Sequence, residues 1–272
     1  MRCHYLSDLH LESQNVDVSF PKGDLLILAG DLCHARCLDP GLDRGPTDRY
    51  AADQRGRVHR FLDAARANFA HVLLVAGNHE FYDGIFEDTP ALLRRHLDRV
   101  TVLDNETVEI GGMRFFGSTF WTDFDGRSSD ALDAVRRRMG EYFFVKCHRG
   151  VPASPLTRFR PEDAWQAHEA ARAALLTAVA ASPKPLVVIT HHAPSRQGLN
   201  PTFAGNGLDP AYASGLDEMI AGFDNVPVWV HGHTHIVRSY QIGRTDVHTN
   251  APGLARERGV VRKITARWFD LD

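Results

Sequence analysis

The chain contains 272 residues, of which 43% are hydrophobic and 24% are charged, so it can build the core of an ordinary globular protein. Its formal net charge of −3 argues against a general nucleic-acid-binding protein, and we expect no binding of duplex nucleic acid. No apolar run approaches the roughly 18 residues that a membrane-spanning helix needs, so we expect no association with a membrane.

The cysteines favour a cytoplasmic location. There are four of them: Cys3, Cys33, Cys37 and Cys147. They form no C-x-x-C pair and no dense framework, so we expect reduced thiols. Cys33, His34 and Cys37 lack a second ligand pair at zinc-finger spacing, so buried or loop cysteines are favoured over a metal site. We also expect no cleaved secretory leader, because cleavage would remove the first predicted strand, which directly precedes Asp8.

Strands and helices alternate in the N-terminal part of the chain. Apolar runs predict strands over 3–6, 24–29 and 72–76, and helical spacing predicts helices over 57–69 and 90–99. Such alternation indicates parallel βαβ units. The polar stretch 34–56 has no periodicity, and we expect a long loop there.

The pattern changes near residue 100. Short strands of antiparallel character are predicted over 102–103, 107–110 and 113–116. The segment 123–161 reads as irregular, and we expect it to cover the ligand-binding edge. It contains Arg136-Arg137-Arg138, for which a solvated face is the favoured interpretation and a contact with substrate phosphate is the alternative.

The remainder returns to strands and helices. A helix is predicted from Pro161, with His168 on its apolar stripe as a core residue. Strands are predicted over 186–189 and 226–230, with a short helix over 212–221 between them. A hairpin over 236–242 and 245–249 follows. A closing strand is predicted near 260–268. We find no repeat or linker, so we predict an α/β protein with two sheets in a single domain, residues 1–272.

Carboxylate, amide and imidazole groups follow five of the predicted strands at their carboxyl ends. They are Asp8, His10, Asp31, Asn78, His79, His191, His233 and His235. Ligands bind at this edge in open α/β sheets. Asp8 and His10 are two residues apart, as are His233 and His235, so each pair faces one side if the backbone is extended. The sequence does not separate His191 from its neighbour as the candidate ligand.

The number of these groups exceeds what one tetrahedral site uses. They suit two divalent ions about 3.5–4 Å apart that share a carboxylate. A set of nitrogen and oxygen ligands without thiolates favours manganese, iron, zinc or similar ions. His79 follows a predicted ligand without having to be one, and an imidazole in that position can donate a proton near neutral pH.

The order of these motifs resembles the calcineurin-like metallophosphoesterase superfamily. The matching pieces are Asp8-x-His10, Gly30-Asp31, Gly77-Asn78-His79-Glu80, Thr190-His191-His192 and Gly232-His233-x-His235. They span most of the chain. The resemblance implies two mixed β-sheets packed as a sandwich and flanked by helices, a four-layer αββα arrangement, with a binuclear metal site at the strand ends.

The resemblance also implies roles for these residues. One ion would be held by Asp8, His10 and His235, the other by Asn78, His191 and His233, with Asp31 bridging the two. A metal-bridging hydroxide would attack phosphorus while His79 aids the leaving oxygen. We expect a small phosphodiester or nucleotide-like substrate. A phosphomonoester or phosphoprotein substrate is the alternative, and a non-catalytic scaffold is disfavoured because every ligand position is filled.

Overall fold

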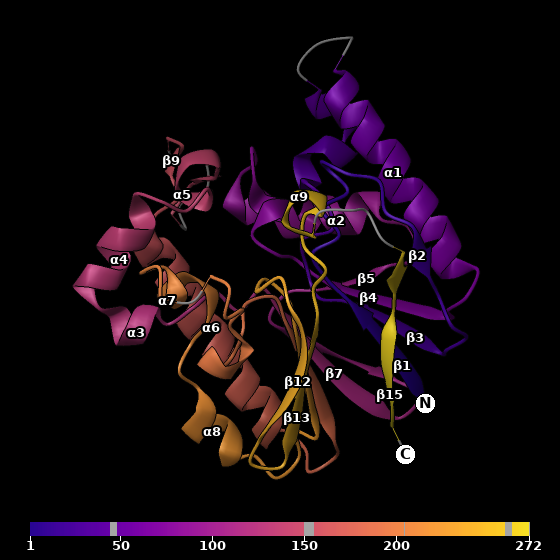
Figure 1. Cartoon of the computed structure of the whole chain (residues 1–272), viewed down its shortest axis with the longest axis vertical. Coiled ribbons are helices and arrows are strands. Elements are labelled where there is room, and N and C mark those ends of the chain that lie inside the picture. Colours follow the sequence, from indigo (N-terminus) through magenta and orange to yellow (C-terminus); the bar gives the residue numbers. More distant parts are fainter. Residues whose placement is uncertain (44–47, 150–154, 204, 259–262, 272) are drawn as a thin grey trace.

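The computed structural model describes residues 1–43, 48–149, 155–203, 205–258 and 263–271. They form two mixed β-sheets that pack face to face, with helices on both outer faces (Figure 1). The predicted four-layer αββα sandwich is therefore confirmed. No helix within the described ranges is long and apolar enough to cross a membrane.

The first sheet has five strands in the order β15-β1-β3-β4-β5. Their bounds are β1 (Arg2–Leu6), β3 (Leu25–Leu28), β4 (His71–Val75), β5 (Thr101–Leu103) and β15 (Arg267–Asp270). All are parallel except β15, which runs antiparallel to β1. The expected antiparallel character of residues 102–103 is wrong, because β5 continues the parallel order beside β4.

The second sheet has six strands in the order β12-β13-β11-β10-β7-β6. Their bounds are β6 (Glu106–Ile110), β7 (Met113–Ser118), β10 (Leu186–Thr190), β11 (Val228–His231), β12 (Val237–Ile242) and β13 (Thr245–Asn250). The four central strands are parallel, and each edge strand pairs antiparallel with its neighbour. Short pairs also join β2 (Val18–Ser19) to β14 (Ile264–Thr265) and β8 (Lys146–Cys147) to β9 (Thr157–Arg158).

Alternation along the strands builds three apolar layers. Ile27 and Val187 belong to the layer between the sheets, whereas the adjacent Leu26 and Val188 face the helices outside. The first sheet is covered by α1 (Arg49–Arg66) and α2 (Thr89–His96), and the second by α6 (Pro161–Ala180) and α8 (Asp217–Ala221). Strands buried on both faces explain the unbroken apolar runs of the sequence.

The expected long loop 34–56 is largely ordered. It contains short 3₁₀ turns at Ala35–Leu38 and Pro40–Leu42, and α1 begins at Arg49 rather than near residue 57. The Asp48 carboxylate caps the helix by accepting the N–H of Ala51 at 3.1 Å. The first helical turns bury few side chains and so lack an apolar stripe, which is why periodicity did not reveal them. Residues 44–47 lie outside the described part.

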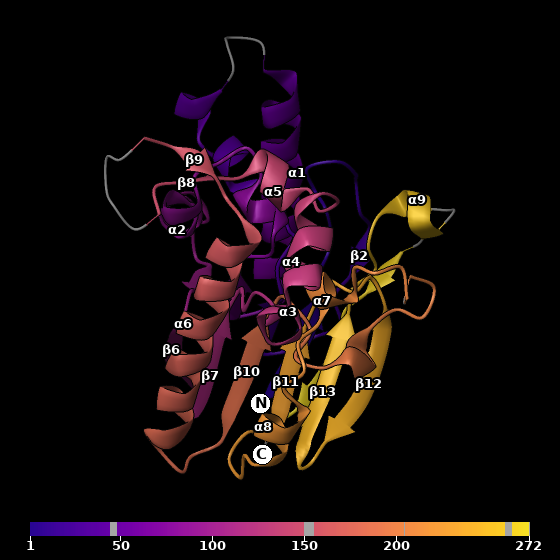
Figure 2. The ribbon, with the colours of Figure 1, turned by 90° about the vertical axis from the view of Figure 1, so that its left-hand side faces the viewer.

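The expected irregular segment 123–161 also contains regular elements. They are α3 (Phe124–Arg127), α4 (Ser129–Arg136), α5 (Glu141–Phe144), β8 and β9. This segment lies over the carboxyl ends of the second sheet's strands, as expected (Figure 2). The short helix expected over 212–221 is two helices, α7 (Asp209–Tyr212) and α8. Part of the segment, residues 150–154, and part of the closing strand, residues 259–262, lie outside the described part.

Candidate metal centre

The turns after five parallel strands bring all the predicted site residues together. The strands are β1, β3, β4, β10 and β11, and the turns carry Asp8 with His10, Asp31, Asn78 with His79, His191, and His233 with His235. Every one of these side chains except His79 and His235 is buried. The predicted site residues therefore converge at the carboxyl ends of the strands, as the sequence predicts.

The backbone at these turns is not extended. Asp8, His10, Asp31, His233 and His235 all have φ between 46° and 66°, in the left-handed region that non-glycine residues rarely adopt. The expectation that the paired residues face one side through extended backbone is therefore wrong. Left-handed turns direct these side chains to the site instead. A left-handed backbone is strained for residues other than glycine, and such strain persists where the surrounding structure enforces it.

One group of potential ligands combines Asp8, His10 and His235, whose ligand atoms lie within 4.8 Å of one another. His235 Nε2 is 3.3 Å from Asp8 Oδ1 and 3.2 Å from His10 Nε2. The Asp8 carboxylate also accepts the backbone N–H of His233 at 2.9 Å and the hydroxyl of Ser7. These hydrogen bonds fix the carboxylate in place.

A second group combines Asp31, His191 and His233 within the same limit of 4.8 Å. His191 Nε2 lies 3.4 Å from Asp31 Oδ1 and 3.2 Å from His233 Nδ1. The same nitrogen lies 3.0 Å from Asn78 Oδ1. On the other side, His10 Nε2 lies 3.8 Å from Asp31 Oδ2. Asp31 therefore directs one oxygen toward each group, an arrangement open to a bridging carboxylate.

The orientation of His191 fits a bound cation. Its Nδ1–H donates to the carbonyl of Ala29 at 2.8 Å, and burial lowers its pKa to about 4, so Nε2 carries a lone pair at neutral pH. That lone pair faces the oxygens of Asn78 and Asp31, which are also acceptors. Once Asp31 is ionised these acceptors repel one another, and a divalent cation between them removes the repulsion.

Two glutamates that the sequence analysis did not single out orient the imidazoles. Glu12 Oε1 lies 2.9 Å from His10 Nδ1, and Glu257 Oε2 lies 2.5 Å from His235 Nδ1. A carboxylate on Nδ1 holds the proton there and directs Nε2 toward a metal. The spacing of Glu12, two residues after His10, was an available signal. Glu257 lies in the short helix α9 (Ala255–Arg258), where no motif marks it.

Glu80 supports the site from behind. Its fully buried carboxylate accepts backbone N–H groups of Asp31 at 2.9 Å, Leu32 at 2.7 Å, Cys33 at 3.0 Å and Gly77 at 2.6 Å. These bonds join the turn after β3 to the turn after β4. Glycine is required at residue 77, because a Cβ there would lie 2.2 Å from Asp31 Oδ1.

The electrostatics of the site also call for added positive charge. Burial raises the pKa of Asp31 well above its ordinary value. Burial opposes ionisation of Asp8 too, but its hydrogen bond with His235 and that residue's charge lower its pKa. Burial disfavours charging of His235, whereas hydrogen bonds with Asp8 and Glu257 outweigh it and raise its pKa to about 10. A divalent cation beside Asp31 would supply the positive charge that stabilises its ionised carboxylate.

Comparison with known proteins identifies the family. The sequence profile described as calcineurin-like phosphoesterase matches residues 1–237. The chain belongs to this family. Membership confirms the resemblance drawn from the motifs and places the chain among metal-dependent phosphoester hydrolases.

Individual relatives are more distant. An uncharacterised protein of Acanthamoeba polyphaga mimivirus is 24% identical over 217 residues, which cover 74% of each chain. Among solved structures, the phosphopantetheinyl hydrolase of Mycobacterium tuberculosis aligns with a TM-score of 0.64 at 19% identity, over 99% of this chain and 96% of that one. At this identity the likeness shows a shared fold only.

His79 of this phosphoesterase lies beside both ligand groups. Its Nδ1 is 3.1 Å from Glu12 Oε1, and its ring stacks on Tyr82 with centroids 4.4 Å apart. Burial opposes its protonation, but the charge of Asp31 and the hydrogen bond with Glu12 raise its pKa. One of the two ring nitrogens of His79 also lies within 4.8 Å of ligand atoms of His10 and Asp31. The role of His79 as an acid therefore stays a prediction.

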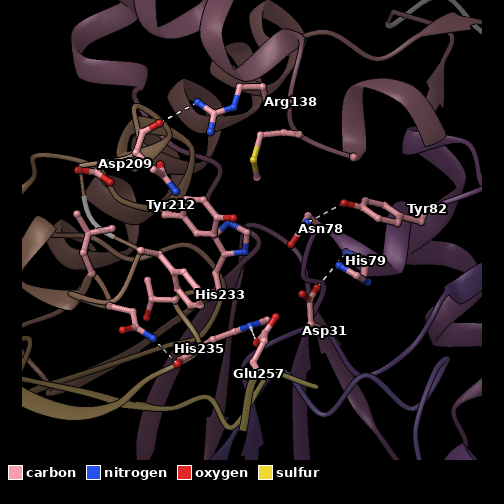
Figure 3. Close-up of a pocket in the computed structure, with 17 residues that line it drawn as sticks. Asp31, Asn78, His79, Tyr82, Arg138, Asp209, Tyr212, His233, His235 and Glu257 are labelled. Atoms are coloured by element: carbon pink, nitrogen blue, oxygen red, sulfur yellow. Dashed lines mark hydrogen bonds and ion pairs between the residues drawn. The ribbon is translucent and has the colours of Figure 1, made fainter. Parts of the chain in front are cut away.

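A cavity of about 300 Å³ opens over the site (Figure 3). Its inner wall contains the predicted ligands Asp31, Asn78, His233 and His235. Its other lining residues include Tyr82, Arg138, Met139, Leu199, Asn200, Phe203, Asn206, Asp209, Tyr212 and Glu257. A cavity of this size fits a small ester better than an extended polymer.

Three further interpretations concern neighbouring histidines and cysteines. The buried His192 directs Nδ1 to a backbone carbonyl at 3.2 Å, so His191 is the one that reaches the ligand groups. His231 likewise directs Nδ1 to a backbone carbonyl at 2.9 Å, as expected for a structural residue. Throughout the described ranges, Cys33 and Cys37 are buried free thiols that belong to no group of potential ligands.

Proposed function

We propose that this chain is a binuclear metal-dependent phosphodiesterase that hydrolyses a small or nucleotide-like phosphodiester. The observation that carries the proposal is the pair of ligand groups, each with its ligand atoms within 4.8 Å, that meet at Asp31. Metal-ligand groups that share a carboxylate suit two-metal displacement at phosphorus.

The proposed ligands divide between two ions. Asp8, His10 and His235 would hold one ion and Asn78, His191 and His233 the other, with Asp31 bridging. When bound, such ions lower the pKa of a coordinated water and neutralise charge on phosphoryl oxygens. Manganese, iron and zinc all suit these nitrogen and oxygen ligands.

The residues around the ligands would position the ester and its leaving group. Glu12 holds His79 through Nδ1, which leaves Nε2 as the ring atom available to a departing oxygen. Tyr82 stacks on a face of that imidazole and limits its rotation. We propose that His79 donates a proton from Nε2 to the leaving alcohol.

The charges of the cavity support a diester over a monoester. A phosphodiester carries one negative charge at the scissile group, whereas a monoester carries up to two near neutral pH. Among the described lining residues, Arg138 is the sole lysine or arginine, while Asp209 and Glu257 add negative charge. The lining therefore offers little compensation for the second charge of a monoester beyond what bound ions supply.

A substrate panel tests the proposal. Metal-stripped protein reloaded with Mn²⁺ is assayed on bis(p-nitrophenyl) phosphate, p-nitrophenyl phosphate, a phosphoprotein and a phosphopantetheinyl ester, the group named for the Mycobacterium tuberculosis protein. We expect a higher kcat/KM on the diester than on the monoester and no activity before metal is added. Faster monoester cleavage would make the chain a phosphomonoesterase. Two bound ions with no activity on any ester would indicate a non-catalytic scaffold.

The proposed location is the cytoplasm. The cysteines Cys3, Cys33, Cys37 and Cys147 are all buried free thiols, as expected in a reducing compartment. Fractionation of the source cells, with activity on the diester as the marker, tests this location.

A further inference from the structure

The three consecutive arginines after α4 have different surroundings. Arg136 pairs with Glu162, at 2.5 Å between Nη2 and Oε1. Arg137 is exposed and does not line the cavity. Arg138 is also exposed, but it lines the cavity above the metal centre. Arg137 therefore lies on a solvated face, and Arg136 forms a structural ion pair. Neither description accounts for the position of Arg138 in the cavity wall.

Arg138 has a backbone hydrogen-bond partner but no acidic partner among the described residues. Its Nη1 donates to the backbone carbonyl of Asn206 at 2.8 Å. Across the described ranges, no carboxylate oxygen lies within 4 Å of its guanidinium, although Asp209 lines the same cavity. Asp209 instead accepts the backbone N–H of Gly205 at 3.2 Å. The guanidinium thus keeps N–H donors for a ligand, and its planar donors suit phosphate or carboxylate.

Arg138 shares its side of the cavity with Tyr212, which contacts the metal centre. The Tyr212 ring stacks on His233, with centroids 4.6 Å apart and an interplanar angle of 24°. Tyr212 and Arg138 both line the cavity. In Figure 3 Arg138, Asp209 and Tyr212 lie on one side of the cavity, and His79 and Tyr82 lie on the other.

We propose that Arg138 binds a second anionic group, a phosphate or a carboxylate, on the part of the substrate that is not the leaving group. This inference rests on the proposed function, because it assumes that the scissile phosphate sits at the metal centre. The leaving oxygen would then lie beside His79, and the retained alcohol would extend toward Arg138. Glu257, which lies against His235, disfavours a second anion on that part of the lining, whereas Arg138 is the sole lysine or arginine among the described lining residues.

Matched chromogenic esters test the proposal. Thymidine 5′-(p-nitrophenyl phosphate) and its 3′-phosphorylated form release the same leaving group and differ only in an anion on the retained nucleoside. A p-nitrophenyl alkyl phosphate series with and without a terminal carboxylate extends the comparison to a second anion. A charge-assisted hydrogen bond changes affinity by about tenfold to a hundredfold. We expect wild-type kcat/KM to favour at least one anion-bearing ester by that factor.

Three variants assign the effect to Arg138. Arg138→Gln should abolish the preference while changing kcat/KM on the anion-free ester less than about twofold, and Arg138→Lys should restore part of the preference because it keeps the charge. Arg137→Gln is the matched control and should retain the full preference. Equal wild-type rates on every matched pair, or an equal loss by Arg138→Gln on both members, would overturn the proposal.

A binding measurement separates this proposal from the proposed function. Calorimetric titrations compare thymidine 3′,5′-bisphosphate with thymidine 5′-phosphate in wild type and Arg138→Gln. Tighter wild-type binding of the bisphosphate that Arg138→Gln removes supports the anion site, even if no ester is hydrolysed. Hydrolysis of both esters together with equal binding of the two nucleotides would overturn the anion site and leave the phosphodiesterase proposal intact.

Discussion

His79 and Glu12 show how much chemistry depends on single side chains at this site. The Glu12 carboxylate is the shared partner of His10 and His79, at 2.9 Å and 3.1 Å from their Nδ1 atoms. One buried carboxylate therefore orients both a proposed metal ligand and the proposed acid. The identities of these histidines could be predicted from motifs, whereas their common partner could not, because motif spacing does not report contacts between side chains.

His79→Ala tests the acid at the residue scale. A positioned general acid contributes about 10²–10⁴-fold, but only where the departing oxygen needs a proton. Nitrophenolate leaves readily as an anion and an alkyl alcohol does not. We expect the variant to keep its metals and to lose that factor on alkyl esters, with a much smaller loss on nitrophenyl esters. Values of kcat/KM on both ester types, with metal content measured in parallel, provide the check.

The alternative role of His79 gives a different pattern. If the imidazole binds an ion, His79→Ala should lose one metal per chain, and both ester types should slow together. If it only positions substrate, the losses should be equal while both metals remain. Either pattern would end the assignment of His79 as the acid and would leave the metal ligands unaffected.

At the scale of elements, long apolar patterns were the reliable signal. The predicted apolar strands and the helix from Pro161 are present because both faces of a central strand and one face of α6 are buried. Short elements near the cavity, such as α4 and α5, were missed because only one or two turns of each are helical. The start of α1 was missed for a different reason, since its first turns are mostly polar and carry no apolar stripe.

His168 on α6 predicts a pH effect on stability. The side chain is 1% exposed, and its Nδ1 bonds to the carbonyl of Trp121. Burial lowers its pKa from the ordinary value of 6.5. The unfolded chain therefore binds the proton more readily, so this residue's contribution to the free energy of unfolding falls as the pH drops below about 6.5, by at most about 1.4 kcal/mol per pH unit.

Denaturant titrations of metal-free protein at pH 7.5 and 5.0 measure this effect. His168→Gln should be less stable than wild type at the higher pH, and the difference should shrink at the lower pH. His59→Gln, on the exposed face of α1, is the control, and it should follow wild type at both values. A constant difference between His168→Gln and wild type would show that the imidazole stays in the same protonation state on unfolding.

At the scale of the whole molecule, the proposed metal centre joins the two sheets. Asp8, His10, Asp31 and Asn78 follow strands of the first sheet, whereas His191, His233 and His235 follow strands of the second. Metal binding should therefore stabilise the packing of one sheet against the other. The sequence predicted this grouping well because parallel strands end at one edge. It could not predict the left-handed turns, which depend on the packing around them.

Two substitutions separate the bridging ligand from a ligand of one ion. Because Asp31 has an oxygen toward each group, Asp31→Asn should weaken both ions and remove most of the increase in Tm that Mn²⁺ gives. His10→Ala should weaken mainly one ion and retain part of that increase. Metal analysis with thermal unfolding measures both. Wild type that holds at most one ion under saturating Mn²⁺ would rule out the binuclear site.

The placement of the site residues along the chain also constrains when the site can form. Asp8 and His10 lie near the beginning, His235 and its partner Glu257 lie near the end, and β1 pairs with β15, the last strand of the described chain. A nascent chain on the ribosome therefore exposes its first ligands long before their partners have been synthesised. The complete set of ligands and their partners can therefore assemble only after synthesis has passed Glu257.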